Sequence, residues 1–173
     1  MGSPSVASLF AQRVTVGVGD LGASNNSMLT LSTYALGSCV AVVAHDPSTR
    51  ASGLLHVMLP DSTISPGKAA AQPAMFVDTG MPLLFRALEG LKCNRSTLKL
   101  FVTGGASVLC DSDVFRIGDR NVKATLTWLA QRGYGIRATA VGGTINRTVH
   151  LEVGTGHLEL KTPSGTERAT LGG

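Results

Sequence analysis

The chain has 173 residues, of which 43% are hydrophobic and 15% are charged, and its formal net charge is +4. A chain of this length suits a single domain, and its hydrophobic content favours a folded core over disorder. The lysines and arginines are scattered singly, without interleaved aromatic residues, so nucleic acid is not an expected partner. No apolar stretch approaches the roughly 20 residues of a membrane helix, and no signal peptide opens the chain, so we expect a cytoplasmic protein without membrane insertion.

Apolar residues alternate with a period of two, or form short runs between turn residues, along much of the chain, and both patterns predict β-strands. In chain order, the predicted strands cover residues 14–19, 28–33, 40–44, 53–59, 98–102, 135–141, 149–153 and 157–161. Residues 22–27 predict a loop between the first two strands. Asp46-Pro47 predicts a tight turn between the third and fourth strands.

Two helices are expected between these strands. A stripe of leucines predicts a helix over residues 78–91, with Asp78 as its N-cap, because Pro82 is tolerated only in the first turns. A second helix is expected over residues 118–133, with a stop at Gly133. Residues 61–72 predict a loop long enough to act as a lid.

Hairpins, few parallel crossovers and two helices together predict an α+β fold with the helices against one sheet face. We expect residues 1–13 to form a flexible N-terminal extension, residues 14–162 to form the folded domain, and residues 163–173 to form a polar, mobile tail. The three cysteines predict no disulfide framework, because their number is odd and a cytoplasmic protein keeps its thiols reduced.

The most informative feature is the hairpin that Cys39 opens and that contains His56. If the turn centres on Pro47-Ser48, the register sets Cys39 directly opposite His56, with Cβ atoms about 4.5–5.5 Å apart on one face. A change of one residue in the length of the turn would place the two side chains on different faces.

A thiol beside an imidazole is the arrangement that makes cysteine a nucleophile. The thiol has a pKa of about 8.5, and the imidazole can take its proton and later protonate a leaving amine. The tight turn at Gly37 and Ser38, just before Cys39, can aim backbone N–H groups at a developing oxyanion. Thr33, on the strand that leads into this turn, is the candidate for orienting the imidazole of His56.

A structural role is the alternative for each of these residues. A cysteine at the start of a strand is often a small buried hydrophobe, and a histidine in a strand is often a core residue. Cys93 and Cys110 are interpreted as incidental thiols. Cys39, Cys93, Cys110 and His45 lack the ligand spacing of a zinc site, and Gly104-Gly105 is too short for a phosphate-binding loop, so neither a metal nor a cofactor is expected.

With these residues in view, the chain resembles the chemoreceptor glutamine deamidases of bacterial chemotaxis, the CheD family, over residues 14–162. The matching segments, in order, are Ala35-Leu36-Gly37-Ser38-Cys39-Val40-Ala41-Val42, Asp46-Pro47, Leu55-His56-Val57-Met58-Leu59-Pro60, Pro66-Gly67-Lys68, Val77-Asp78-Thr79-Gly80-Met81-Pro82, Gly104-Gly105-Ala106-Ser107, Ile117-Gly118-Asp119-Arg120-Asn121 and Gly142-Gly143. The combination is far more specific than any one segment.

The resemblance implies that residues 14–162 form a deamidase domain, an α–β–β layered sandwich of mostly antiparallel strands with two main helices. It implies hydrolysis of selected glutamine side chains on methyl-accepting chemotaxis receptors to glutamate and ammonia. It also implies the roles of the site residues: Cys39 forms a thioester, His56 is the general acid and base, and Thr33 is the third polar residue.

Members of the family can also bind a phosphatase of the response regulator, of the CheC type, which makes such a phosphatase a second candidate partner. The alternative function is therefore a regulatory binding module that docks this phosphatase and has little catalysis of its own. Cleavage of peptide bonds is a weaker enzyme hypothesis, because no sequence feature indicates a cleft for an extended strand.

Overall fold

The computed structural model describes residues 12–107 and 115–172. Cys110 and most of the expected 1–13 extension lie outside these ranges, and Gln12 and Arg13 belong to the first strand. The strands are β1 (Gln12–Thr15), β2 (Asp20–Ser24), β3 (Leu29–Leu36), β4 (Val40–Asp46), β5 (Ala51–Val57), β6 (Lys99–Gly104), β7 (Ala138–Val141), β8 (Arg147–Glu152), β9 (His157–Thr162) and β10 (Gly165–Thr170). The helices are α2 (Pro66–Ala71), α3 (Val77–Gly90) and α4 (Ile117–Gln131), with 3₁₀ turns η1 (Ser62–Ile64) and η2 (Pro73–Met75).

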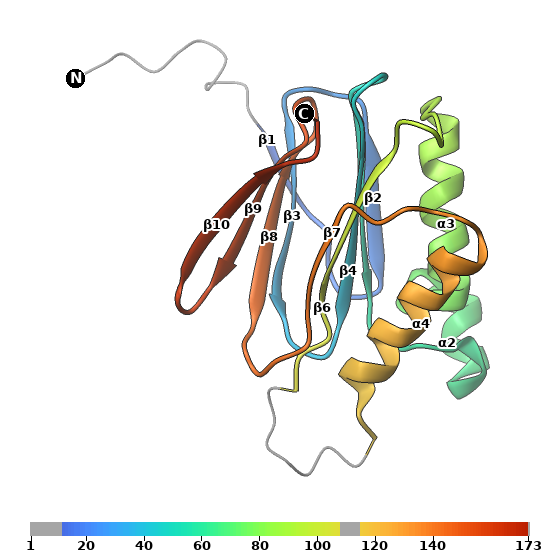
Figure 1. Cartoon of the computed structure of the whole chain (residues 1–173). Coiled ribbons are helices and arrows are strands. Elements are labelled where there is room, and N and C mark those ends of the chain that lie inside the picture. The colour runs from blue at the N-terminus through green and yellow to red at the C-terminus, as the bar shows by residue number, and fades with distance from the viewer. Residues whose placement is uncertain (1–11, 108–114, 173) are drawn as a thin grey trace.

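Two sheets and a helical layer are stacked in three layers (Figure 1). Sheet A has the strand order β1-β3-β8-β9-β10, and sheet B has the order β2-β5-β4-β6-β7. Among the described pairs, β1–β3 and β6–β7 are parallel and the others are antiparallel. Helices α3 and α4 cover the face of sheet B that is turned away from sheet A. The expected α+β fold and its α–β–β layering are confirmed.

Strand β4, in the middle of sheet B, is buried along its whole length and contributes to two cores. Ala41 and Val43 point into the layer between the sheets, whereas Val40 and Val42 pack against the helices. The alternation follows from the pleat of the strand, and burial of both faces explains why the sequence shows an unbroken apolar run here.

The N-terminal strand differs from its prediction. Of the strand expected over residues 14–19, only residues 14 and 15 lie in a strand, β1; the next strand, β2, begins at Asp20 and belongs to the other sheet. The chain turns between β1 and β2 at residues 16–19, where Gly19 has a φ of +70°, a backbone conformation that residues with a Cβ rarely adopt. The loop expected at residues 22–27 is wrong in its first half, because residues 22–24 pair with β5.

The predicted hairpin exists, but the expected register is wrong. Ala41, rather than Cys39, pairs with His56, so the pairing is shifted by two residues.

Contacts from a distant segment explain the shift. Residues 47–50 form a turn of four residues between Asp46 and the next strand, rather than a turn of two. The carboxylate of Asp46 accepts hydrogen bonds from Ser48 N at 2.9 Å, Asn94 N at 2.7 Å and Thr97 Oγ1 at 2.6 Å. The turn is therefore shaped in part by the segment that precedes β6.

Both main helices lie within one or two residues of their predicted bounds. The N-cap expected at Asp78 is wrong: α3 begins at Val77 without a side-chain cap, and Asp78 accepts hydrogen bonds from the backbone and hydroxyl of Ser62. Residues 61–72, expected as a loop, contain η1 and α2. The stop at Gly133 is confirmed by its φ of +70° just after α4.

The C-terminal segment expected as a tail, residues 163–173, is not free over its described part, residues 163–172. Residues 165–170 form β10, which pairs antiparallel with β9 at the edge of sheet A. Every residue of β10 is exposed. An edge strand without a buried face needs no apolar alternation, so the sequence pattern gave no sign of it.

Candidate active site

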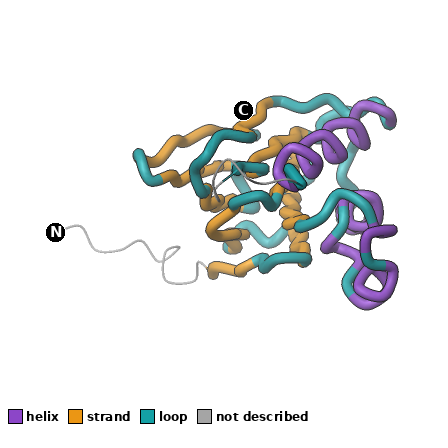
Figure 2. Tube along the Cα trace, turned by 90° about the horizontal axis from the view of Figure 1, so that it is seen from below, coloured by secondary structure: helices purple, strands orange, loops and turns teal. Residues whose placement is uncertain are grey.

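One end of the two sheets gathers the turns that carry the predicted site residues (Figure 1), and Figure 2 views the molecule from this end. Strand β3 ends and β4 begins there, with Gly37, Ser38 and Cys39 in the turn between them. Because β5 runs antiparallel to β4, it ends at the same edge, one residue after His56. The end of β6 and the start of α4 also lie at this end.

Cys39 and His56 lie on the same face of sheet B. Cys39 packs against the core between the two sheets, and His56 follows Leu54 of that core by two residues, so its side chain points the same way. In the observed register His56 is a diagonal neighbour of Cys39 rather than its direct partner. A shift of two residues preserves the face, so the thiol and the imidazole still share one side of the sheet.

Thr33 holds the imidazole of His56 from the opposite sheet. Its hydroxyl donates a hydrogen bond to the carbonyl of Val16 at 2.7 Å, and its oxygen lies 2.7 Å from Nδ1 of His56. Because the single hydroxyl proton is used on Val16, Nδ1 must carry the proton of the second bond and donate it to Thr33. His56 is therefore held in the tautomer whose Nε2 has an open lone pair. This Nε2 is buried and has no hydrogen-bond partner in the described part of the chain.

Burial keeps both reactive groups neutral. It lowers the pKa of His56 from 6.5 to about 4, because a buried imidazolium loses its hydration. It also raises the pKa of the Cys39 thiol above its ordinary value, an effect that the residue's own backbone N–H partly opposes. At neutral pH the pair is therefore a thiol and a neutral imidazole that can accept its proton.

Each of three successive carbonyl groups of the turn before β4 accepts a hydrogen bond, either from the loop after β6 or from α4. The hydrogen bonds run from Ala106 N to Gly37 O at 2.8 Å, from Asn121 Nδ2 to Ser38 O at 2.9 Å and from Gly105 N to Cys39 O at 2.7 Å. Sequence reasoning gave Asn121 no role, although this residue ends one of the family-like segments. Its contact joins residues 83 positions apart, which no local pattern indicates.

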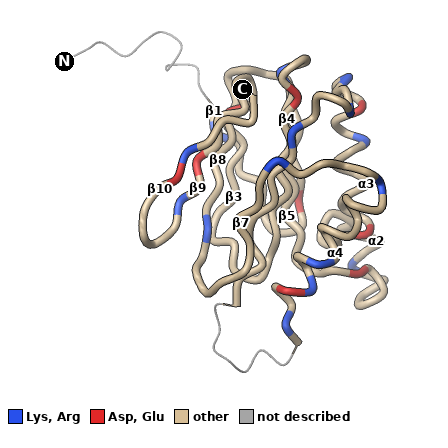
Figure 3. Tube along the Cα trace, in the orientation of Figure 1, with Lys and Arg blue, Asp and Glu red and all other residues tan. Residues whose placement is uncertain are grey.

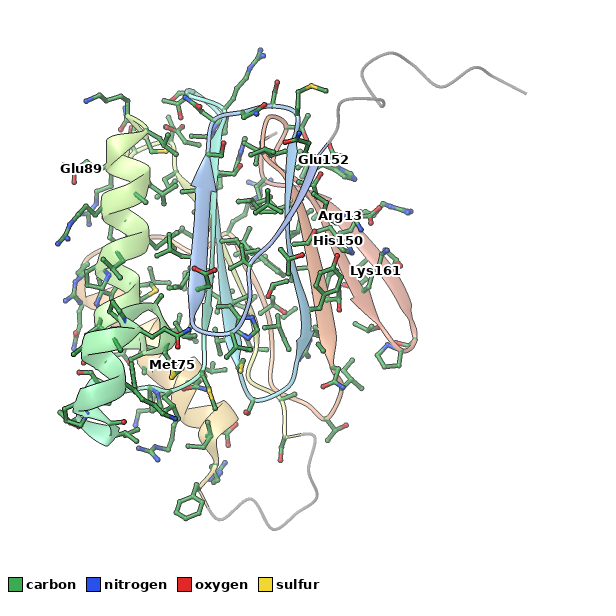
Figure 4. All side chains as sticks on the ribbon, turned by 180° about the vertical axis from the view of Figure 1, so that it is seen from behind. Arg13, Met75, Glu89, His150, Glu152 and Lys161 are labelled. Carbon is green, nitrogen blue, oxygen red and sulfur yellow. The ribbon has the colours of Figure 1, made fainter. Side chains whose placement is uncertain are left out.

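Two other histidines also bond a buried hydroxyl group, but neither lies at this end. Nδ1 of His150 is 2.7 Å from Ser32 Oγ, and Figure 4 shows His150 beside Arg13 and Lys161 on sheet A. His45 bonds a serine hydroxyl near the far end of β4. Of these three histidines, His56 is the one placed beside the turn that precedes β4.

Other features of the described chain indicate no second reactive centre. No described group of three or more His, Cys, Asp or Glu side chains could hold a metal ion. Cys93 follows α3, and its Sγ lies 3.7 Å from Oγ1 of Thr49, in the turn at the opposite end of β4 from Cys39. Two hollows of about 420 and 480 Å³ lie in the helical layer and are lined by neither Cys39 nor His56. No described helix has both the length and the apolar character needed to cross a bilayer.

Comparison with known proteins adds an independent observation. The family model described as CheD chemotactic sensory transduction matches residues 58–162. The chain is 43% identical over 155 residues to the probable chemoreceptor glutamine deamidase CheD 1 of Syntrophus aciditrophicus, covering 90% of this chain and 97% of that relative. It is also 43% identical over 150 residues to the probable chemoreceptor glutamine deamidase CheD of Solibacter usitatus, covering 87% and 89%.

Among solved structures, a Neisseria meningitidis protein of the DUF152 family aligns over 76% of this chain and 62% of that one, with a TM-score of 0.41 and 10% identity. A similarity this low supports no conclusion about function.

Proposed function

Because the chain belongs to the CheD family, we propose that it hydrolyses the side-chain amides of selected glutamine residues on methyl-accepting chemotaxis receptors. The products are glutamate and ammonia. The observation that carries the proposal is the lone pair of His56 Nε2, which Thr33 fixes on the face of the sheet that Cys39 shares. The names of the relatives, chemoreceptor glutamine deamidases, supply the class of substrate.

The first half of the reaction forms a thioester on Cys39. The thiol passes its proton to Nε2 of His56 while its sulfur bonds to the carboxamide carbon. The carbonyl electrons become an oxyanion, which the backbone N–H groups of Ser38 and Cys39 stabilise. The imidazolium of His56 then gives its proton to the amide nitrogen, the C–N bond breaks and ammonia leaves.

The second half of the reaction hydrolyses the thioester. His56 takes a proton from water as the water oxygen bonds to the thioester carbon, and the C–S bond then breaks. The departing sulfur recovers the proton from His56, which restores the starting thiol and imidazole. Throughout both halves Thr33 accepts the hydrogen bond from Nδ1, so that Nε2 remains the atom that moves protons.

The surface around the site suits a folded protein as substrate. Five segments at the end of the molecule that holds the site carry no lysine, arginine, aspartate or glutamate: residues 16–19, 34–39, 57–60, 104–107 and 142–146. These segments do carry exposed apolar side chains: Val18, Tyr34, Met58 and Ile145. The start of α4, at the same end, carries Arg116, Asp119 and Arg120 (Figure 3). The apolar part of this rim favours contact with the apolar surface of a protein that presents a neutral carboxamide.

Incubation of the purified chain with a receptor cytoplasmic fragment tests the proposal. Peptide mass spectrometry should find glutamine residues whose NH₂ group has been replaced by OH, with an equal amount of ammonia released. Cys39→Ala should abolish both signals without unfolding the protein, whereas the control Cys93→Ala should keep them. Equal turnover by Cys39→Ala would remove Cys39 from the mechanism, and no turnover by the wild type would remove the proposed function.

A regulatory module that docks a CheC-type phosphatase, with little catalysis of its own, is the second candidate function. The raised pKa of Cys39 fits this candidate as well as it fits the enzyme, because in both cases the resting thiol is largely protonated at neutral pH. Alkylation by iodoacetamide at neutral pH separates the two candidates, with Cys93 as the internal reference. Faster labelling of Cys39 than of Cys93 favours the enzyme, and a silent Cys39 favours the binding module.

A further inference from the structure

Asn121 is a fully buried polar residue near the start of α4, beside the turn that precedes β4. The helix approaches this closely because Gly118 has no Cβ. A Cβ at that position would lie 2.7 Å from the carbonyl oxygen of Gly105 and 2.8 Å from that of Ala106. The same two loop residues donate hydrogen bonds to the turn. The close packing of α4 on the loop that contains Gly105 and Ala106 therefore places Asn121 at the site.

The amide nitrogen of Asn121 bridges the two strands that carry the proposed reacting groups. It donates to the carbonyls of Ser38 and Met58, each at 2.9 Å. Ser38 immediately precedes Cys39, and Met58 follows His56 by two residues. The two carbonyl acceptors fix the orientation of the amide, because its oxygen could not bond to either of them.

The oxygen of the Asn121 side chain has no partner in the described part of the chain, although it is buried. A buried acceptor without a partner costs stability. An apolar residue at this position would avoid that cost, so the two donated bonds must account for the asparagine.

The bond to Ser38 also orients the backbone N–H of Cys39. In a planar trans peptide, the C=O of one residue and the N–H of the next point in opposite directions, so a Ser38 carbonyl held toward α4 aims this N–H away from α4. The N–H lies against the sulfur of Cys39, whose pKa it lowers. Among the described residues, the amides of Ser38 and Cys39 donate no backbone hydrogen bond to another residue. Both are thus available to an oxyanion that forms beside the sulfur.

We propose that Asn121 is a positioning residue for deamidation: by holding the Ser38 carbonyl, it aims the Cys39 N–H at the oxyanion formed when Cys39 attacks the carboxamide. Its second bond, to Met58, ties the strand of His56 to the same anchor. This inference rests on the proposed function, because only an acyl-transfer reaction produces the oxyanion.

Asn121→Leu removes both donor N–H groups while keeping a side chain of similar size. We expect kcat for deamidation of the receptor fragment to fall about 10- to 100-fold, because one oxyanion donor is misaligned. KM should change less than about threefold, since the oxyanion forms only after the substrate has bound. Alkylation of Cys39 by iodoacetamide should also change less than about threefold, because displacement of iodide develops no oxyanion.

The matched control is Thr125→Val, one helical turn further along α4. Thr125 is also fully buried, and its hydroxyl has no partner among the described residues, so its loss should change neither kcat nor alkylation. Thermal unfolding monitored by circular dichroism shows whether each variant folds. If Asn121→Leu does not fold, Asn121→Ser gives the same comparison with a smaller change in polarity.

A spectroscopic readout tests the geometry without activity. The chain has three cysteines, so labelling with ¹⁵N-cysteine yields few amide signals, and Cys39→Ala identifies the one from Cys39. A hydrogen bond at the Ser38 carbonyl polarises the peptide group that contains the Cys39 amide. Asn121→Leu should therefore move the Cys39 signal and leave that of Cys93 in place, and Thr125→Val should move neither.

An unmoved Cys39 signal would overturn the inference, as would an unchanged kcat. A parallel fall of kcat and alkylation would also overturn it, because Asn121 would then only keep the thiol in place. These outcomes are distinct from failure of the proposed function, in which the wild-type chain itself does not deamidate the receptor fragment. In that case the proposed role of Asn121 in orienting an oxyanion donor would also be wrong.

Discussion

Replacing Thr33 by valine removes one hydroxyl group on which two other buried groups depend. The carbonyl of Val16 loses its donor and Nδ1–H of His56 loses its acceptor, each of which lies 2.7 Å from the hydroxyl oxygen. Thr33 is fully buried, so water cannot replace either bond. A buried group left without a partner costs about 1–3 kcal/mol, and the added methyl group recovers part of that cost. We therefore expect the free energy of unfolding to fall by about 2–4 kcal/mol.

The same substitution also affects the reaction. Without Thr33 as acceptor, the proton of the His56 imidazole can move to Nε2, which then cannot take the proton of Cys39. A hydrogen bond worth about 0.5–1.5 kcal/mol corresponds to roughly a tenfold bias between the tautomers. We expect kcat to fall about 10-fold by this effect, far less than the complete loss expected for Cys39→Ala. Urea unfolding and ammonia release measure the two quantities.

Two control variants test whether these effects come from the hydrogen bonds of the Thr33 hydroxyl. Thr33→Ser keeps a hydroxyl that can bond both partners, so it should restore most of the stability and rate. Thr125→Val deletes another fully buried hydroxyl, one without a partner among the described residues, and should be nearly neutral. If Thr33→Val proved as stable and as active as Thr125→Val, the Thr33 hydroxyl would have no part in holding the imidazole.

Three further predictions concern pH. kcat/KM should rise as His56 loses its proton near pH 4 and stay level through neutrality. It should fall only above pH 9.0, where Cys39 loses the proton that the leaving ammonia needs. A rise of kcat/KM near pH 6.5 would contradict the burial of His56. Because the folded-state pKa of His56 is lowered to about 4, its contribution to stability is fully present above the unfolded-state pKa of about 6.5 and is lost as pH falls toward 4. Urea unfolding should show a loss of about 3 kcal/mol over this range that His56→Gln removes, and equal slopes in both proteins would refute the assignment. Alkylation of Cys39 should rise about tenfold per pH unit from 6 to 8, whereas a plateau would reveal a resting thiolate–imidazolium pair.

The sequence could predict that Cys39 and His56 lie on one face of the sheet. An error in the strand register changes the face only when it is an odd number of residues. The register itself could not be predicted, because Asp46 accepts hydrogen bonds from Asn94 and Thr97, which the sequence does not reveal as its neighbours. The predicted direct pairing was therefore wrong by two residues while the shared face was retained.

The contacts of Thr33 and Asn121 likewise could not be predicted from the sequence. The sequence suggested Thr33 because it precedes the turn, but its bond to Val16 depends on the parallel pairing of β1 with β3, and its bond to His56 depends on how the two sheets stack. Asn121 could not be assigned from spacing, since its partners Ser38 and Met58 lie 83 and 63 positions earlier in the chain. By contrast, the resemblance to the CheD family rested on many short segments in order, and it is confirmed by the family match and by relatives at 43% identity.

The most direct test of the mechanism is interception of its covalent intermediate with hydroxylamine during turnover of a receptor fragment. A thioester on Cys39 would partition between water and hydroxylamine, so hydroxamate should appear on the same glutamine residues that otherwise become glutamate, and none should form with Cys39→Ala. If ammonia is released at the full rate while only glutamate forms at every hydroxylamine concentration, the amide is attacked by water directly and Cys39 is not the nucleophile.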